Sequence, residues 1–160
     1  MAAPGPGTLF PASSLRTEDG RAAPRAARET LYAVFHTECP TSELCWPYLE
    51  RLRRIGDGGG LPVVGVSQDD PSETAAFLAR LGVSAPVLYD PPPWKASQAL
   101  GLSSVPALAR VGADGRVQEI VVGFQKARLD GLATRAAELS GRPAGSLFGP
   151  NENVPAVRPG

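Results

Sequence analysis

The sequence has no surplus of charge of either sign. Its 160 residues include 16 lysines and arginines and 16 aspartates and glutamates, so the formal net charge is zero. Proteins that bind nucleic acids or anionic membrane surfaces use a clustered excess of positive charge, which this composition lacks. The charge balance therefore predicts partners other than nucleic acid or a membrane.

Residues that bind metals or form disulfides are scarce as well. One histidine and two cysteines are too few for a convincing zinc site, and two cysteines do not make a disulfide framework. We therefore expect no metal and no cofactor.

No apolar run approaches the roughly 20 residues that span a bilayer. The N-terminus lacks the basic segment and long apolar stretch of a secretory signal. These absences predict a cytoplasmic protein.

The length of the chain predicts one domain, and such a chain buries roughly two-thirds of its unfolded surface. Residues 1–7 are rich in alanine, proline and glycine, and we expect them to be disordered. Residues 8–140 carry the regular patterns and form the predicted domain. Residues 141–160 are rich in proline and glycine and are predicted to form a tail, held down by Leu147 and Phe148.

Short apolar runs alternate with segments of helical period along this domain. Continuous apolar runs suit central strands that are covered on both faces. Alternating strands and helices followed by a hairpin and a helix predict the α/β class, with a mixed central sheet flanked by helices on both faces. The expected strands are 31–35, 61–66, 83–89, 107–111 and 116–122, and the expected helices are 40–55, 71–81, 94–100 and 126–139.

Two shorter patterns add detail to this outline. Asp19-Gly20 is a hairpin turn signal near the N-terminus. The glycine run at 56–60 lacks the Gly-Lys-Ser/Thr of a phosphate loop, so we interpret it as a flexible connection.

Cys39 is the main candidate for chemistry. An apolar strand ends at Phe35, and Pro40 fits the first turn of a helix, where a missing N–H is tolerated. Cys39 should therefore lie where the strand passes into the helix. Unpaired N–H groups and the positive end of the helix dipole stabilise thiolate, the reactive form, at such a place. The alternative is a small buried apolar residue, the common fate of a free cysteine.

The pattern of an apolar strand, Cys-Pro-Thr-Ser at 39–42 and a helix containing Pro47 resembles the active-site segment of the thioredoxin-like superfamily. Ser-Val-Pro-Ala at 104–107 resembles the segment whose cis-proline faces the active-site cysteine. The separation between these segments is longer than in plain thioredoxin, as in the TlpA-type and redoxin (AhpC/TSA-like) branches. The resemblance covers about residues 8–140. It implies the thioredoxin fold with a redoxin-type βα insertion.

The resemblance also implies roles for individual residues. Cys39 would be the nucleophile and Ser42 its hydrogen-bond partner. The substrate-binding residues would be Pro40, Thr41, Val105, Pro106 and Gly123.

Ser42 is a departure from the family, whose motif usually has a second cysteine at this position. A hydroxyl cannot attack a mixed disulfide, so turnover would need an external thiol. A single-cysteine oxidoreductase is therefore expected, rather than the two-cysteine cycle of thioredoxin.

Cys45 is the other cysteine, and two interpretations of it remain open. It could resolve a disulfide with Cys39, but six helical residues span roughly 9 Å, whereas a disulfide needs Cα atoms within about 7 Å. Local unwinding of the helix near Pro47 would then be required. In the other interpretation Cys45 packs in the core beside Leu49 and Leu52.

Three functions fit these residues. The first is a thiol–disulfide oxidoreductase that acts on protein or low-molecular-weight thiols and disulfides, as a monomer or homodimer. The second is a thiol peroxidase, an antioxidant enzyme that would react with peroxides through Cys39. Thr37 lies two residues before Cys39 rather than three, which counts against a true peroxiredoxin. The third is a non-catalytic binding module, in which Cys39→Ser would leave partner binding intact.

Overall fold

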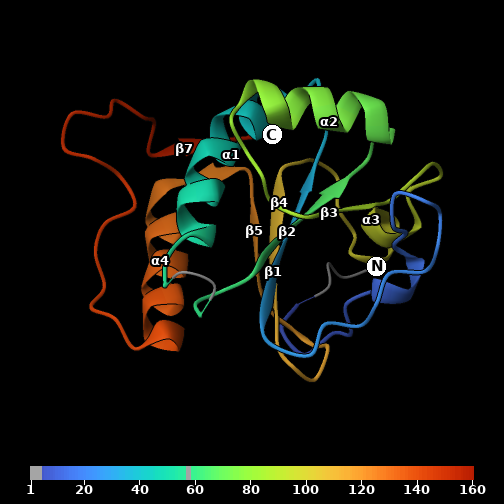
Figure 1. The fold of residues 1–160 in the computed structure, drawn as a ribbon, viewed down its shortest axis with the longest axis horizontal. Helices are drawn as coiled ribbons and strands as arrows, with labels where there is room; N and C mark the ends of the chain where they lie inside the picture. Colours follow the sequence, from blue (N-terminus) through green and yellow to red (C-terminus); the bar gives the residue numbers. More distant parts are fainter. Residues whose placement is uncertain (1–4, 57–58) are drawn as a thin grey trace.

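The computed structural model describes residues 5–56 and 59–160 (Figure 1). Residues 1–4 of the predicted disordered segment and residues 57–58 of the glycine run lie outside the described part. A 3-10 turn at Ala12–Ser14 precedes the regular elements. These are β1 (Thr30–Phe35), α1 (Pro40–Arg53), β2 (Val63–Ser67), α2 (Pro71–Arg80), β3 (Val87–Tyr89), α3 (Lys95–Ala99), β4 (Ala107–Val111), β5 (Val117–Val122), β6 (Phe124–Gln125), α4 (Lys126–Ser140) and β7 (Val157–Arg158).

Five strands form one mixed sheet in the order β3-β2-β1-β4-β5. The strands β1, β2 and β3 are parallel, whereas β4 is antiparallel to both β1 and β5. The predicted mixed central sheet is confirmed. The strands β6 and β7 pair separately and antiparallel, in a small second sheet.

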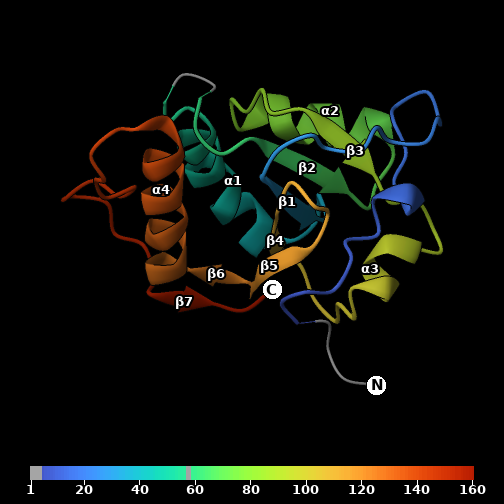
Figure 2. The ribbon, with the colours of Figure 1, turned by 90° about the horizontal axis from the view of Figure 1, so that it is seen from below.

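Both faces of the central sheet are covered (Figure 2). Alternate residues of β1 point to opposite faces, so Phe35 and Tyr32 belong to different cores. The first core joins one sheet face to α1, α2 and α4. The second core joins the other face to α3 and to the N-terminal segment, which contributes Phe10 and Leu15. This arrangement explains why β1 is buried along its whole length.

The helices begin where their sequences predict. Asp70 caps α2 by accepting a hydrogen bond from the Glu73 N–H at 2.8 Å, and Pro71 occupies the first turn. α4 ends at Gly141, whose φ of 69° is a left-handed conformation that glycine adopts without steric cost. The apolar spacing in this helix predicts a buried stripe of Leu129, Leu132, Ala136 and Leu139, and all but Leu139, which is exposed, are buried.

Two predicted strand features differ in the structure. The strand expected over 83–89 is paired only at Val87–Tyr89. The N–H of Val83 instead closes the end of α2 by donating to Leu78 O at 2.9 Å, so it is not available to a sheet. The signal at Asp19-Gly20 produces a turn with one bridge, Arg16 to Ala22, rather than a hairpin of two strands. Arg16 also exchanges backbone hydrogen bonds with Tyr89 of β3.

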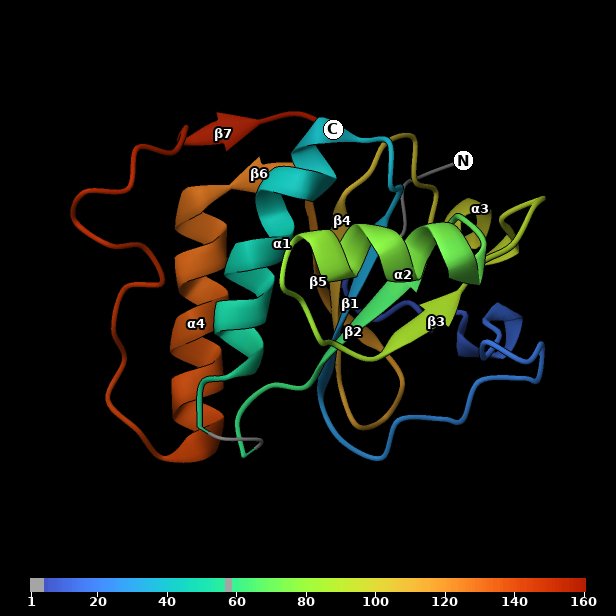
Figure 3. The same cartoon turned by 45° about the horizontal axis from the view of Figure 1, so that its top comes forward.

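The segment after α4 has little regular structure and runs back along the outside of α4 to β7 (Figure 3). Leu147 and Phe148 are buried in the first core, as their apolar side chains predict. The Asp130 carboxylate of α4 accepts a hydrogen bond from the Leu147 N–H at 2.7 Å. The chain then runs past α4 to β7, and from there to the beginning of α1.

Candidate functional site

Cys39 is the N-cap residue of α1. Its Sγ accepts a hydrogen bond from the Ser42 N–H at 3.4 Å and lies 3.4 Å from Val105 O, to which the thiol can donate. The backbone carbonyl of Cys39 accepts the first bond of the helix, from Glu43 N–H at 3.1 Å. The sulfur is therefore held at the N-terminus of α1, where a backbone amide donates to it. The predicted junction between strand and helix is confirmed.

The loop before Cys39 is held by Asp69, which follows β2. The Asp69 carboxylate accepts a hydrogen bond from the Thr37 N–H at 2.7 Å, and the same oxygen lies 3.1 Å from Nδ1 of His36. His36 O in turn accepts from the Cys39 N–H at 3.2 Å. Asp69 therefore positions the residues that lead into Cys39. The sequence predicted only that Asp69 lies near the start of α2. No local signal indicated its contact with Thr37, which is 32 positions away.

The opposite side of the site comes from the loop before β4. The Val105–Pro106 peptide bond is cis, as the resemblance predicts. Pro106 is buried, and its carbonyl accepts a hydrogen bond from the Gly123 N–H at 2.7 Å. Cys39, Val105, Ser103 and Ser104 line one cavity of about 340 Å³, together with His36, Glu38 and Gly160.

Ser42 is close to Cys39, but it acts through its backbone. The residue is fully buried, and its hydroxyl has no hydrogen-bond partner among the described residues. The predicted partnership with Cys39 is therefore made by the Ser42 N–H and not by the hydroxyl. A buried hydroxyl without a partner carries a desolvation cost, and a less polar side chain of similar size would avoid it.

Cys45 lies in the first core with no exposed surface. Burial raises the pKa of the Cys45 thiol to about 12, and the nearby Cys39 sulfur adds to this rise. The two cysteines are not bonded, and α1 is continuous from Pro40 to Arg53 between and beyond them. This placement favours the interpretation that Cys45 is a packing residue over the interpretation that it resolves a disulfide.

Native protein at pH 8 should therefore react with iodoacetamide at Cys39 alone. A thiol with a pKa of about 12 is thiolate about one thousandfold less often at this pH than an ordinary cysteine, and burial slows it further. Peptide mapping after a time course measures both sites, and a denatured sample in which both cysteines react serves as the control. Comparable labelling of native Cys45, or a disulfide between the two cysteines, would contradict this prediction.

The remaining predicted binding residues surround Cys39, with two of them in contact with the end of the chain. Pro40 is exposed in the first turn of α1. Thr41 donates a hydrogen bond from Oγ1 to Pro159 O at 2.8 Å. Gly123 has a φ of 76°, and a Cβ on it would lie 2.7 Å from Arg158 O, so only glycine allows this approach. No pattern in the sequence indicated that residues 158–160 would reach this site.

Comparison with known proteins identifies the fold. No protein-family model matches the sequence, and no curated protein matches it. Among solved structures, a Chlorobium tepidum protein described as the thiol:disulfide interchange protein DsbE aligns with a TM-score of 0.72 and 18% identity, over 87% of this chain and 99% of its own. DsbF from MTB aligns with a TM-score of 0.65 and 21% identity, over 82% and 99%. The thioredoxin domain of a thiol-disulfide oxidoreductase from Bacteroides vulgatus aligns with a TM-score of 0.64 and 13% identity, over 76% and 91%.

This chain has the thioredoxin fold. The elements β3 and α3, between α2 and β4, supply the additional βα material that the resemblance predicted. Cys39 lies at the beginning of α1 in this fold, and Val105–Pro106 lies at the beginning of β4. Direct pairing of β1 with β4, with Val34 opposite Ala107, brings these two places together.

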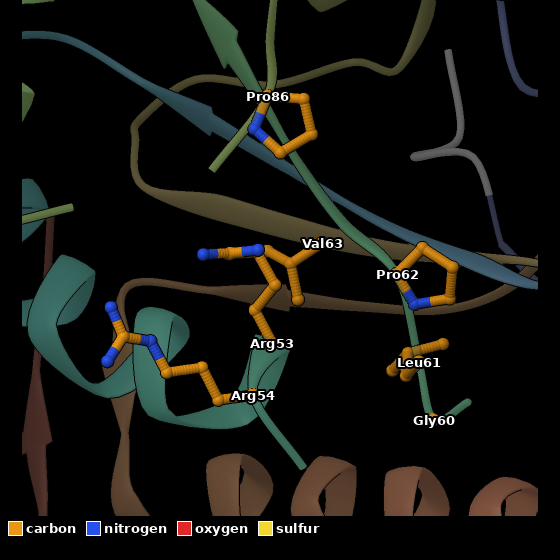
Figure 4. Close-up of a pocket in the computed structure, with 7 residues that line it drawn as sticks. All are labelled: Arg53, Arg54, Gly60, Leu61, Pro62, Val63 and Pro86. Carbon is orange, nitrogen blue, oxygen red and sulfur yellow. The ribbon is translucent and has the colours of Figure 1, made fainter. Parts of the chain in front are cut away.

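A second cavity lies at the other end of α1 (Figure 4). It measures about 390 Å³ and is lined by Arg53, Arg54, Gly60 to Val63, and Pro86. The Arg53 guanidinium donates hydrogen bonds there to the Glu50 carboxylate and, at 2.9 Å, to Ser84 Oγ. The cavity shares no lining residue with that of Cys39.

In the described part of the chain, no helix is both long and apolar enough to cross a membrane. The same residues contain no group of three or more histidine, cysteine, aspartate or glutamate side chains that could hold a metal ion.

Proposed function

We propose that this protein carries out thiol–disulfide exchange through Cys39. The observation that supports the proposal is the position of Cys39 Sγ. This sulfur accepts a hydrogen bond from the Ser42 N–H at the N-terminus of α1, and Cys39 lines a cavity beside Val105. The Ser42 amide donates a hydrogen bond to this sulfur, and the Val105 carbonyl can accept one from the thiol. Solved structures with the same fold bear the names of thiol–disulfide oxidoreductases, which agrees with this chemistry.

The proposed reaction has two exchange steps. In the first, the Cys39 thiolate attacks one sulfur of a partner disulfide. A Cys39–partner disulfide forms, the partner disulfide breaks, and the other sulfur leaves as a thiolate that takes a proton from water. In the second, an external thiolate attacks the partner sulfur of the mixed disulfide, a disulfide forms between the external thiol and the partner, and Cys39 leaves as a thiolate. Ser42 cannot act in the second step, and Cys45 lies buried in the core.

Protein or low-molecular-weight thiols and disulfides are the proposed partners, because the reaction needs a sulfur that can reach an open cavity. Among the described residues that line that cavity, Cys39 carries the only thiol. A cytoplasmic location remains a prediction from the sequence.

Reduced protein mixed with an excess of an aromatic disulfide should release about one equivalent of thiol per chain, since one native sulfur is reactive. The intact mass of the chain should increase by the mass of one thiol half of the disulfide reagent, and peptide mapping should place this added group on Cys39. Cys39→Ser should release none, whereas Cys45→Ala should react as the unmodified chain does.

A parallel sample with one equivalent of peroxide separates exchange from peroxidase activity. Slow oxidation over many minutes is expected. Oxidation of Cys39 to a sulfenic acid within seconds would favour a thiol peroxidase and would refute the proposed function.

A further inference from the structure

Residues 154–160 form a strap that crosses the small sheet and ends beside the active-site cysteine. Val154 packs against the first core, while residues 155–160 are exposed. In β7, Val157 pairs with Gln125 and Arg158 pairs with Phe124. The Lys126 N–H donates to Ala156 O at 2.9 Å, which continues the pairing by one residue. The strap is therefore attached mainly through its backbone.

The strap reaches the beginning of α1 (Figure 3), and its last residues contact both sides of the cysteine site. Pro159 O accepts the hydrogen bond from Thr41, in the first turn of α1, at 2.8 Å. Gly160 lies so close to the Val105–Pro106 peptide that a Cβ on this glycine would overlap the Val105 carbonyl. That carbonyl is the atom 3.4 Å from Cys39 Sγ, and Gly160 lines the same cavity as Cys39.

The segment before the strap is held more firmly than the strap itself. Leu147 and Phe148 are buried, and the Phe148 ring packs at a tilt of 40° against the Tyr48 ring, with ring centroids 4.7 Å apart. Glu152 accepts hydrogen bonds from Arg51 and from Tyr48 Oη. The Arg51 guanidinium, with the Gly149 N–H, lowers the pKa of this carboxyl to about 2, so the ion pair persists at neutral pH.

We propose that the strap is an autoinhibitory cover of Cys39 that must detach before a large disulfide partner can react. The inference rests on the proposed exchange function. The strap lies between α1 and the Val105–Pro106 loop, where a polypeptide approaching Cys39 would have to pass. Its detachment would free the Thr41 hydroxyl, the backbone edge of β6 and the surface at Gly123 for an extended chain, which binds sheet edges through its backbone. The anchor at Leu147, Phe148 and Glu152 would keep the detached strap close to its site.

Gly160→Ala tests this inference in the full chain. The added methyl group overlaps the Val105 carbonyl, so the end of the strap must move away. Gly145→Ala is the matched control, because a Cβ there meets no atom within 4 Å and the residue lies after α4 but outside the strap. The measured quantities are the rates at which Cys39 reacts with iodoacetamide and with a maleimide attached to a folded protein.

If the strap covers Cys39, Gly160→Ala should raise the rate with the bulky maleimide about tenfold or more, because reaction follows the population of open chains. The rate with iodoacetamide should change by less than about threefold, since a small reagent can enter without full opening. Gly145→Ala should leave both rates unchanged. Exchange of the Lys126 amide hydrogen, which is bonded to the strap, should accelerate in the same variant.

The double variant Thr41→Val with Gly160→Ala removes both contacts of the strap end with the site. If neither variant raises the rate with the bulky maleimide, the strap does not control access and the proposal is wrong. Faster exchange at Lys126 with unchanged reaction at Cys39 would refute it equally. Alkylation does not require exchange with a disulfide, so these results are independent of whether the proposed function is correct.

Discussion

Replacing Ser42 with cysteine should convert a protein that needs an external thiol to release its partner into one that releases the partner with its own thiol. The Ser42 N–H lies 3.4 Å from Cys39 Sγ, one helical turn along α1, so a thiol at this position would be close to the reactive sulfur. It could attack a Cys39–partner disulfide and release the partner. Because an intramolecular attack avoids the entropy of bringing two molecules together, we expect at least about a hundredfold gain in reduction of a peptide disulfide by dithiothreitol.

The burial of Ser42 makes this substitution structurally acceptable. The serine hydroxyl has no partner among the described residues, and a thiol of similar size is less costly to desolvate. Ser42→Ala is the matched control, since it removes the hydroxyl without supplying a sulfur. It should keep the slower exchange of Cys39 with an external thiol and show no gain in rate. If Ser42→Cys forms no disulfide with Cys39 and gains no activity, position 42 does not function as a resolving position in this fold.

Trp46→Ala should cause the largest loss of stability among single substitutions in α1. Trp46 is fully buried, and its ring meets the edge of Phe35 with centroids 5.1 Å apart. A Cβ on Gly65 of β2 would lie only 3.0 Å from the Trp46 ring, which shows how closely helix and sheet pack here. Truncation of a buried tryptophan leaves a cavity and costs about 3–5 kcal/mol, which chemical denaturation at equilibrium would measure.

Two other variants separate the cavity from other effects of this substitution. Trp46→Phe should cost less than Trp46→Ala, because it fills more of the space and the indole N–H has no hydrogen-bond partner to lose within the described residues. Leu139→Ala, on the exposed side of α4, should cost less than about 1 kcal/mol. A loss below about 1.5 kcal/mol for Trp46→Ala would contradict the packing of α1 against β2 described above.

Local signals in the sequence were sufficient for most of the fold. The apolar run at 31–35 and the proline at 40 placed Cys39 at the end of β1 and the beginning of α1, because backbone preferences act over a few residues. The same held for α2, with Asp70 and Pro71 at its start. The predictions failed where a residue had two possible partners. The N–H of Val83 could close a helix or join a strand, and only the packed chain shows that it closes α2.

The sequence alone determined the class of the fold, the position of Cys39 and the absence of a second cysteine at position 42. Only the tertiary structure decided which groups surround the sulfur. Val105 and Asp69 reach the site through the pairing of β1 with β4 and β2, and the Ser42 hydroxyl turns out to lack a partner. The position of the strap could not be predicted from the sequence either, because it too depends on contacts between distant parts of the chain. Residues 157–160 are exposed and have no apolar pattern, so their position depends on backbone hydrogen bonds to β6 and Thr41, which any sequence of similar shape could make.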